Sequence, residues 1–113
     1  MTTPSTNLQM FSTVSESGEL RLELKEKPIP ALEDNQVLVR IEATPINPSD
    51  QGVMFGWSDI SAATSSGEGQ NTVLTVPVPE QGMRVMKARV GQALAVGNEG
   101  AGTVVATGNA ELA

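Results

Sequence analysis

Alternation of apolar and polar residues predicts a β-hairpin near the start of this chain. The alternation is strict over residues 20–25, where three leucines face one way and three charged residues the other, and it is weaker over residues 8–14. The polar, glycine-containing segment 15–19 is expected to join the two stretches as a turn. We expect the ladder to stop before residues 27–30, because the two prolines there lack a backbone N–H.

Three further stretches predict strands. Residues 36–43 carry the clearest period of two, and residues 72–76 form a short strand stopped by prolines. Residues 103–107 form a mostly apolar, β-branched run, which predicts a buried strand. The two faces of the strand at 36–43 are expected to be Val37, Val39, Ile41 and Ala43 on one side and Leu38, Arg40 and Glu42 on the other.

A short helix is expected to begin at the segment Asn47-Pro48-Ser49-Asp50. An amide suits the N-cap, and proline suits the first helical position. The structural interpretation of Asn47 is therefore a cap, and that of Asp50 is a favourable charge in the first helical turn. Gly52 and Gly56 should keep this helix short.

A second helix is predicted over residues 80–90. Met83, Met86 and Val90 share one face there, and this stripe predicts packing into the core. Residues 58–71 are rich in serine, glycine and alanine, and we interpret them as a mobile excursion rather than a linker, because periodic segments resume after them.

The segment 96–108 combines four glycines with one amide, Asn98, and one carboxylate, Glu99. Glycine tolerates positive φ and lets a backbone or a ligand come close. The structural interpretation is a turn between two strands, and the functional one is a loop presented to a site. A dinucleotide-binding fingerprint would have to open a helix, whereas β-branched residues follow Gly102, so we reject a phosphate-binding loop.

Composition narrows the possible functions. The 113 residues suit one domain, and 39% apolar with 3% aromatic residues predict a thin core. A net charge of −6 without a basic cluster argues against a nucleic-acid partner. No secretory signal or membrane-length apolar run occurs, so we expect a soluble cytoplasmic domain without a membrane partner.

Histidine and cysteine are both absent, which removes the usual zinc ligands and two common catalytic side chains. Asp50 and Glu99 could meet, but a hard-cation site needs several more oxygen ligands. We therefore expect no bound metal.

Two separated segments resemble one protein family. The segment V-L-V-R-I-E-A-T-P-I-N-P-S-D at 37–50 and the segment G-N-E-G-A-G-T-V-V-A-T-G at 97–108 resemble motifs of the quinone oxidoreductase branch of the medium-chain dehydrogenases/reductases. The earlier stretch 20–30, which ends in K-P-I-P, looks like the strand followed by P-x-P in that family.

The resemblance implies a mainly β fold with minor α content: a GroES-like, partly closed β-barrel with one short helix and a second near residues 80–90. Zinc-containing relatives carry cysteine and histidine where this chain has Asn47 and Asn98, so it resembles the zinc-independent branch. That branch reduces quinones or activated carbonyl compounds by hydride transfer from NADPH or NADH. By this resemblance Asn47 and Asp50 would line the catalytic cleft, Asn47 would contact the cofactor or substrate, and Asn98 and Glu99 would support them.

Two departures from the family pattern lead to further expectations. Residues 57–95 are longer than expected between the two motifs and could reshape the substrate mouth. The whole of 1–113 is interpreted as an incomplete GroES-like domain without a nucleotide-binding Rossmann domain, so we expect no cofactor bound and no turnover by these residues alone. An alternative is a stand-alone GroES-like interaction module, which forms a homo-oligomer through exposed strand edges.

Overall fold

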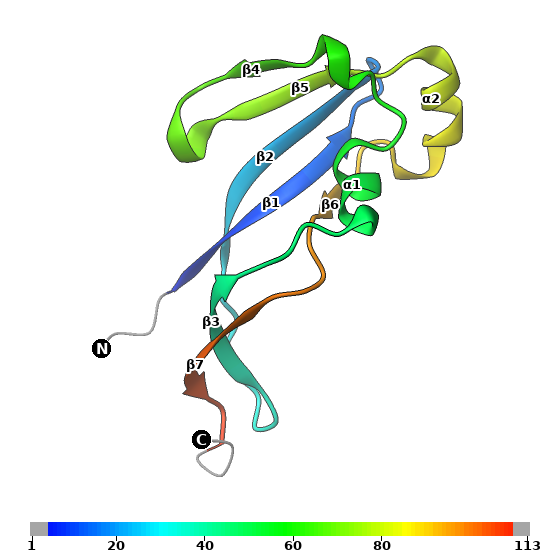
Figure 1. Cartoon of the computed structure of the whole chain (residues 1–113). Coiled ribbons are helices and arrows are strands. Elements are labelled where there is room, and N and C mark those ends of the chain that lie inside the picture. The colour runs from blue at the N-terminus through cyan, green and yellow to red at the C-terminus, as the bar shows by residue number, and fades with distance from the viewer. Residues whose placement is uncertain (1–4, 110–113) are drawn as a thin grey trace.

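Two separate antiparallel sheets organise the computed structural model, which describes residues 5–109 (Figure 1). The chain is mainly β, as predicted, with seven strands and two short α-helices in the part described. The strands are β1 (Thr6–Val14), β2 (Glu19–Pro28), β3 (Val37–Ala43), β4 (Thr64–Ser66), β5 (Val73–Pro77), β6 (Ala93–Ala95) and β7 (Ala101–Thr107). The α-helices are α1 (Pro48–Phe55) and α2 (Glu80–Val85), and single 3₁₀ turns occupy Ile60–Ala62, Gly69–Asn71 and Lys87–Arg89.

The larger sheet has the strand order β4-β5-β2-β1-β6, and the predicted hairpin forms its centre. The β1–β2 ladder runs from Val14 opposite Leu20 to Thr6 opposite Pro28, so the expectation that pairing stops before residue 27 is wrong. The N–H of Ile29 donates to the carbonyl of Ser5 at 2.9 Å. Pro28 therefore occupies the adjacent position without inter-strand hydrogen bonds, where its missing donor faces away from β1 and costs the ladder nothing.

The core is thin and lies at one end of the larger sheet. Its fully buried members include Val14, Leu20 and Val76, joined by Val78 and Met86. Met83 and Val90 pack against this cluster, which confirms the core role predicted for the stripe of the second helix.

The second helix is shorter than predicted. α2 ends at Val85, and a 3₁₀ turn follows it rather than a continued α-helix to residue 90. Val90 forms a β-bridge with Val14, and the N–H of Gly91 donates to the Val14 carbonyl at 2.8 Å. These contacts require extended backbone at Val90, so tertiary hydrogen bonding ends the helix before the apolar pattern does.

Residues 58–71 contain more regular structure than the sequence indicated. Two 3₁₀ turns flank the short strand β4, which pairs antiparallel with β5 and forms an edge of the larger sheet. Within residues 5–109 the two sheets share no ladder and do not join into a closed barrel.

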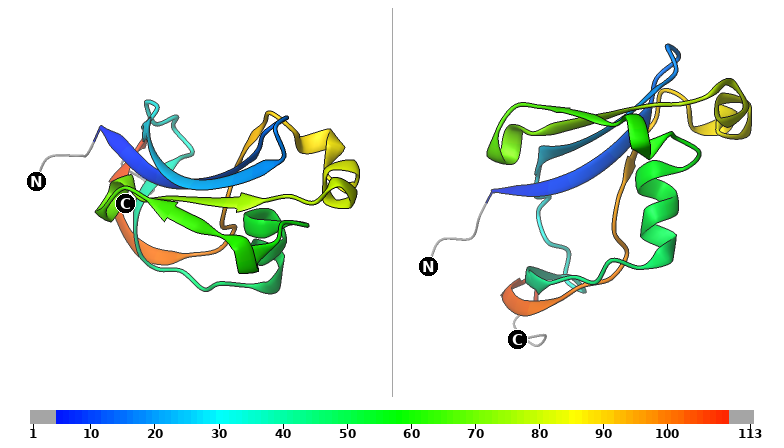
Figure 2. Two further views of the ribbon diagram at one scale, coloured as in Figure 1. Left: turned by 90° about the horizontal axis from the view of Figure 1, so that it is seen from above. Right: turned by 45° about the horizontal axis from the view of Figure 1, so that its top comes forward.

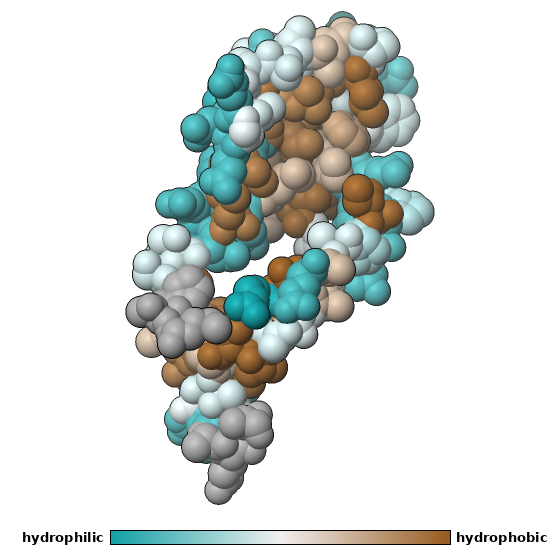
Figure 3. Space-filling model, turned by 60° about the vertical axis from the view of Figure 1, so that its left-hand side comes forward, coloured by the Kyte–Doolittle hydropathy of each residue, from teal (hydrophilic) through white to brown (hydrophobic). Residues whose placement is uncertain are grey.

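The smaller sheet is a two-stranded ribbon of β3 and β7, which lies apart from the core (Figure 2). Val104 is 49% exposed, so the expectation that residues 103–107 form a buried strand is wrong. The β3–β7 ladder also has two register irregularities, one between Leu38 and Val39 and one between Ile41 and Ala43, and the second leaves Glu42 without a partner in the ladder and interrupts the predicted alternation of β3. Figure 3 shows apolar side chains at the surface of this part of the molecule and a hollow between it and the part that contains the larger sheet. A two-stranded ribbon has too little partner surface to bury its own apolar side chains.

Among the helices of the described residues, none combines the length and the apolar character that crossing a membrane would require.

Candidate functional site

The start of α1 places Asn47 and Asp50 as the sequence predicted. Asn47 occupies the N-cap position with extended backbone, and Pro48 follows at the first helical position. The Asn47 backbone N–H donates to Asp50 Oδ2 at 2.8 Å, and the Asp50 N–H donates to the Asn47 carbonyl at 3.0 Å. This reciprocal pairing lets Asp50 be 94% buried while its carboxylate still has a hydrogen-bond donor.

Glu99, which lies just before β7, contacts the same helix start. The side chain of Asn47 donates from Nδ2 to Glu99 Oε2 at 2.8 Å, across 52 residues. The Thr44 hydroxyl donates to the Glu99 backbone carbonyl at 2.6 Å and fixes the loop beside it. The ladder explains the meeting, because Ala43 at the end of β3 pairs with Ala101 at the start of β7.

The structure therefore brings together three of the four predicted site residues. Asn98 is exposed, and no hydrogen bond links it to Asn47, Asp50 or Glu99 among the described residues. Asn47 stands between the two carboxylates, with its backbone on Asp50 and its side chain on Glu99. Within residues 5–109 there is no group of three or more acidic side chains placed to hold a metal ion.

The glycine-rich segment is a turn between two strands, as its structural interpretation predicted. β6 ends at Ala95, β7 begins at Ala101, and Gly97 between them has a φ of +95°. A Cβ at Gly102 would overlap the carbonyl oxygen of Arg40, so close approach of β3 requires glycine here. The segment leads into a strand and not into a helix, so it has no helix N-terminus to receive a phosphate.

A buried polar cluster behind α1 was not predicted from the sequence. Arg89 Nη2 donates to Ser12 Oγ at 2.9 Å and to the Val53 carbonyl at 3.0 Å, while the fully buried Ser12 hydroxyl donates to the Met54 carbonyl at 2.9 Å. Burial lowers the pKa of the Arg89 guanidinium, because it disfavours the charged form. Arg89 and Ser12 are 77 residues apart, and neither occurs in a pattern that points to the other.

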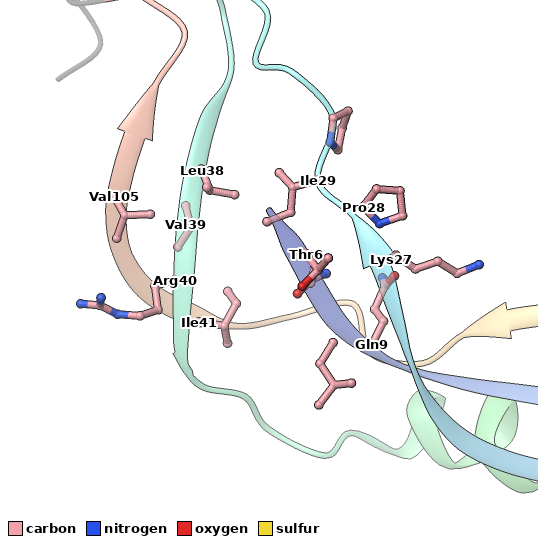
Figure 4. A pocket seen from close by; sticks show the side chains of 13 residues that line it. Thr6, Gln9, Lys27, Pro28, Ile29, Leu38, Val39, Arg40, Ile41 and Val105 are labelled. Carbon is pink, nitrogen blue, oxygen red and sulfur yellow. The ribbon is translucent and has the colours of Figure 1, made fainter. Parts of the chain in front are cut away.

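Two cavities lie outside the Asn47–Glu99 contact. One of about 720 Å³ opens between β3 and the far end of the β1–β2 hairpin, where Leu38 and Ile41 point toward Ile29 (Figure 4). The other, about 460 Å³, lies beside Trp57, Met86 and Arg89. Neither is lined by Asn47, Asp50 or Glu99, and the hydrogen bond between Asn47 and Glu99 lies at an exposed position.

A scan of protein-family models finds none that matches this chain, and a search of curated proteins finds no significant match. Membership of a family therefore stays a prediction, which depends on the motifs at residues 37–50 and 97–108.

Proposed function

We propose that this chain forms the substrate-facing part of a zinc-independent NAD(P)H-dependent oxidoreductase, built on a GroES-like, partly closed β-barrel. The observation that carries the proposal is the 2.8 Å hydrogen bond from Asn47 to Glu99. It joins, across 52 residues, the two segments that resemble the cleft-lining motifs of the quinone oxidoreductase branch. A shared cleft requires such a meeting of separated motifs.

Asn47 is the residue suited to touch a substrate. Its carboxamide nitrogen carries two protons, and Glu99 accepts one of them, so the second remains for a carbonyl oxygen. A quinone or activated carbonyl gains negative charge on its oxygen as it is reduced, and a donor held in place stabilises that charge. A nicotinamide cofactor, when bound, supplies the hydride.

Asp50 and Glu99 act in this proposal as positioning residues. Asp50 holds the backbone of Asn47 at 2.8 Å, and Glu99 holds its side-chain amide at the same distance. Together they fix where the remaining amide proton points, and Thr44 fixes Glu99 through its backbone carbonyl.

The described residues fit the nicotinamide end of the cofactor but not its phosphates. The free amide proton of Asn47 suits a carboxamide or quinone oxygen. The glycine-rich turn offers no helix N-terminus, because β7 follows it. The proposed role is therefore contact with the nicotinamide and the substrate. Without phosphate contacts we expect no tightly bound cofactor and no turnover by residues 1–113 alone, only weak contact at millimolar NADPH.

Two-dimensional amide NMR with NADPH, and separately with a quinone, tests this proposal. We expect shifts of the Asn47 side-chain signals and of the Glu99 backbone signal. The shift at Glu99 should vanish in Asn47→Ala. Gln51→Ala, an exposed position in the same helix, is the matched control and should keep the response. Millimolar NADPH and quinone that leave the Asn47 signals in place would overturn the proposal.

A second candidate is an interaction module without enzymatic activity. It is favoured by the ribbon of β3 and β7, where Val37, Ile41 and Val104 are 40%, 57% and 49% exposed. Exposed apolar strands with free edges invite pairing with another chain. Light scattering over a micromolar concentration series tests this candidate, which predicts a mass above that of the 11.8 kDa monomer.

A further inference from the structure

We infer that the cavity of about 460 Å³ at the C-terminal end of α1 binds a small aliphatic carboxylate, whose charge pairs with the Arg89 guanidinium and whose chain lies against Trp57 and Met86. The inference goes beyond the proposed oxidoreductase function. Asn47 caps the other end of α1 and does not line this cavity, so the two sites are separate.

Arg89 is a half-buried cation without an anionic partner. Within residues 5–109 none of the ion pairs includes it. Its guanidinium donates from Nη2 to Ser12 Oγ at 2.9 Å and to the Val53 carbonyl at 3.0 Å, and both acceptors are neutral. The Val53 carbonyl belongs to the last turn of α1, where a helix carries only a partial negative charge, which is too small to neutralise a guanidinium.

The uncompensated charge of Arg89 favours an external anion. Removing a charge from water costs free energy unless the charge is paired, and burial lowers the pKa of Arg89 for this reason. The Nε–H of the same guanidinium is buried and has no acceptor among the described residues. An anion beside the guanidinium would offset the cost, so Arg89 should bind an anion more tightly than an exposed arginine does.

The second terminal nitrogen of the guanidinium, Nη1, lies at the cavity. A Cβ built at Gly56 would stand 3.5 Å from Nη1, and Gly56 and Arg89 both line the cavity. Both hydrogen bonds from Arg89 to described residues come from Nη2, so the N–H groups of Nη1 remain available. Nη1 can therefore donate to a carboxylate oxygen inside the cavity.

The other walls of the cavity are apolar. Beside Arg89 they consist of Trp57, Val85, Met86 and Ala88, with two glycines from the end of α1. Trp57 and Val85 are 57% and 54% exposed, so a ligand would cover apolar surface that folding leaves in water. The Trp57 backbone N–H donates to Met86 Sδ at 3.5 Å, which holds two of these walls together before a ligand arrives.

One positive charge among apolar walls selects a carboxylate with an apolar chain. The lining contains no acidic residue, although the chain has 13 acidic and only 7 basic residues. A phosphate would bring more than one negative charge to a single guanidinium and would leave the apolar walls uncovered. A neutral amide would cover the walls but leave the charge of Arg89 unpaired. The volume of about 460 Å³ lies within the range of small-molecule sites.

The fluorescence of Trp57 reports binding directly, because it is the only tryptophan of the chain. We expect hexanoate to change this fluorescence saturably, with a dissociation constant in the millimolar range typical of so small a ligand. Hexanamide has the same shape without the charge and should bind about tenfold more weakly, because a charge-assisted hydrogen bond is lost. Acetate and inorganic phosphate should also bind more weakly than hexanoate, since neither covers the apolar walls.

Three results with these probes would overturn the inference. They are the absence of a saturable response to millimolar hexanoate, equal affinities for hexanoate and hexanamide, and tighter binding of phosphate or acetate than of hexanoate.

Removing the positive charge tests the role of Arg89. Arg89→Met keeps an unbranched apolar chain and should weaken hexanoate binding about tenfold or more. Arg84→Met is the matched control, since Arg84 is 69% exposed and pairs with Glu80 on α2, and it should leave the affinity unchanged. An unchanged affinity in Arg89→Met would contradict the assignment.

Changes at Val85 test the same point while Arg89 keeps its internal hydrogen bonds. Val85→Lys adds a second positive charge at the exposed wall and should tighten hexanoate binding about two- to fivefold, whereas Val85→Glu should weaken it by a similar factor. Gln81→Lys changes the net charge equally at an exposed position of α2 outside the lining, so it should have little effect. Equal affinities in Val85→Lys and Gln81→Lys, or no weakening in Val85→Glu, would contradict the proposed site.

Amide NMR locates the bound carboxylate. Hexanoate should shift the signals of residues 52–57 and 85–89 and leave the Asn47 side-chain signals in place, because Asn47 is not part of the lining. Shifts centred on Asn47 would overturn the location. Failure of hexanoate to bind would leave the NADPH response at Asn47 untouched, so the two proposals fail separately.

Discussion

Removing the partners of the Asn47–Glu99 hydrogen bond one at a time tests whether these two segments meet in solution. The changes are Asn47→Ala, Glu99→Ala and the double variant. Because the two residues are 52 apart in sequence, coupling between them can arise only if the ends of β3 and β7 are held together as in the structure.

The structure sets the expected magnitudes. Asn47→Ala removes an N-cap amide, which costs about 1 kcal/mol, together with its bond to Glu99. That 2.8 Å bond involves a carboxylate, but it lies at an exposed site, so about 0.5–1 kcal/mol is its expected share. Glu99→Ala should therefore cost about 0.5–1 kcal/mol, and Asn47→Ala about 1.5–2 kcal/mol.

The double variant should be no less stable than Asn47→Ala alone, which leaves a coupling energy of about 0.5–1 kcal/mol. Urea unfolding followed by circular dichroism measures all four free energies of unfolding. Glu99→Gln keeps a neutral acceptor and should retain about half of the coupling, because charge-assisted bonds are roughly twice as strong. Gln51→Ala, exposed in the same helix, should change stability by less than about 0.5 kcal/mol.

Strict additivity would refute the reasoning. If the losses from Asn47→Ala and Glu99→Ala simply sum in the double variant, the hydrogen bond does not exist in solution. The proposal that Asn47 and Glu99 share one cleft would then lose the observation that carries it.

Three further predictions concern stability. Gly52→Ala should stabilise the folded protein by about 0.5–1 kcal/mol, since no atom lies within 4 Å of the new methyl group. Gly82→Ala should destabilise it, since the new methyl group would stand 2.6 Å from the Trp57 carbonyl oxygen. Thermal melts compare the two variants directly, and equal melting temperatures would count against the packing of α2. Arg89→Lys should cost about 1–2 kcal/mol, because an ammonium keeps the buried charge and cannot reproduce both guanidinium bonds, while Arg89→Met should cost less. Burial lowers the pKa of Arg89, so its charged form opposes folding at every pH below that pKa. The contribution of Arg89 to the free energy of unfolding should therefore stay constant across neutral pH, as measured by urea unfolding. A change in stability near neutral pH that Arg89→Met abolishes would contradict this assignment.

Local patterns determined most of the strands and the start of one helix. Alternating leucines defined β2 because only one of its faces reaches the core, and the Asn47-Pro48 pair defined the start of α1 because both residues suit the geometry of a helix N-terminus. The resemblance also singled out Asn47, Asp50 and Glu99, which the structure brings into contact.

Tertiary structure decided what depends on partners distant in sequence. The second helix ends early because the Gly91 N–H donates a hydrogen bond to the Val14 carbonyl. Pro28 stays in the β1–β2 ladder because its nitrogen faces away from β1. The exposure of β7 could not be predicted from its apolar sequence, since burial depends on whether another layer packs against it. Arg89 and Ser12 meet for the same kind of reason: a hydrogen bond across 77 residues is set by the path of the chain, and neither residue alone indicates it.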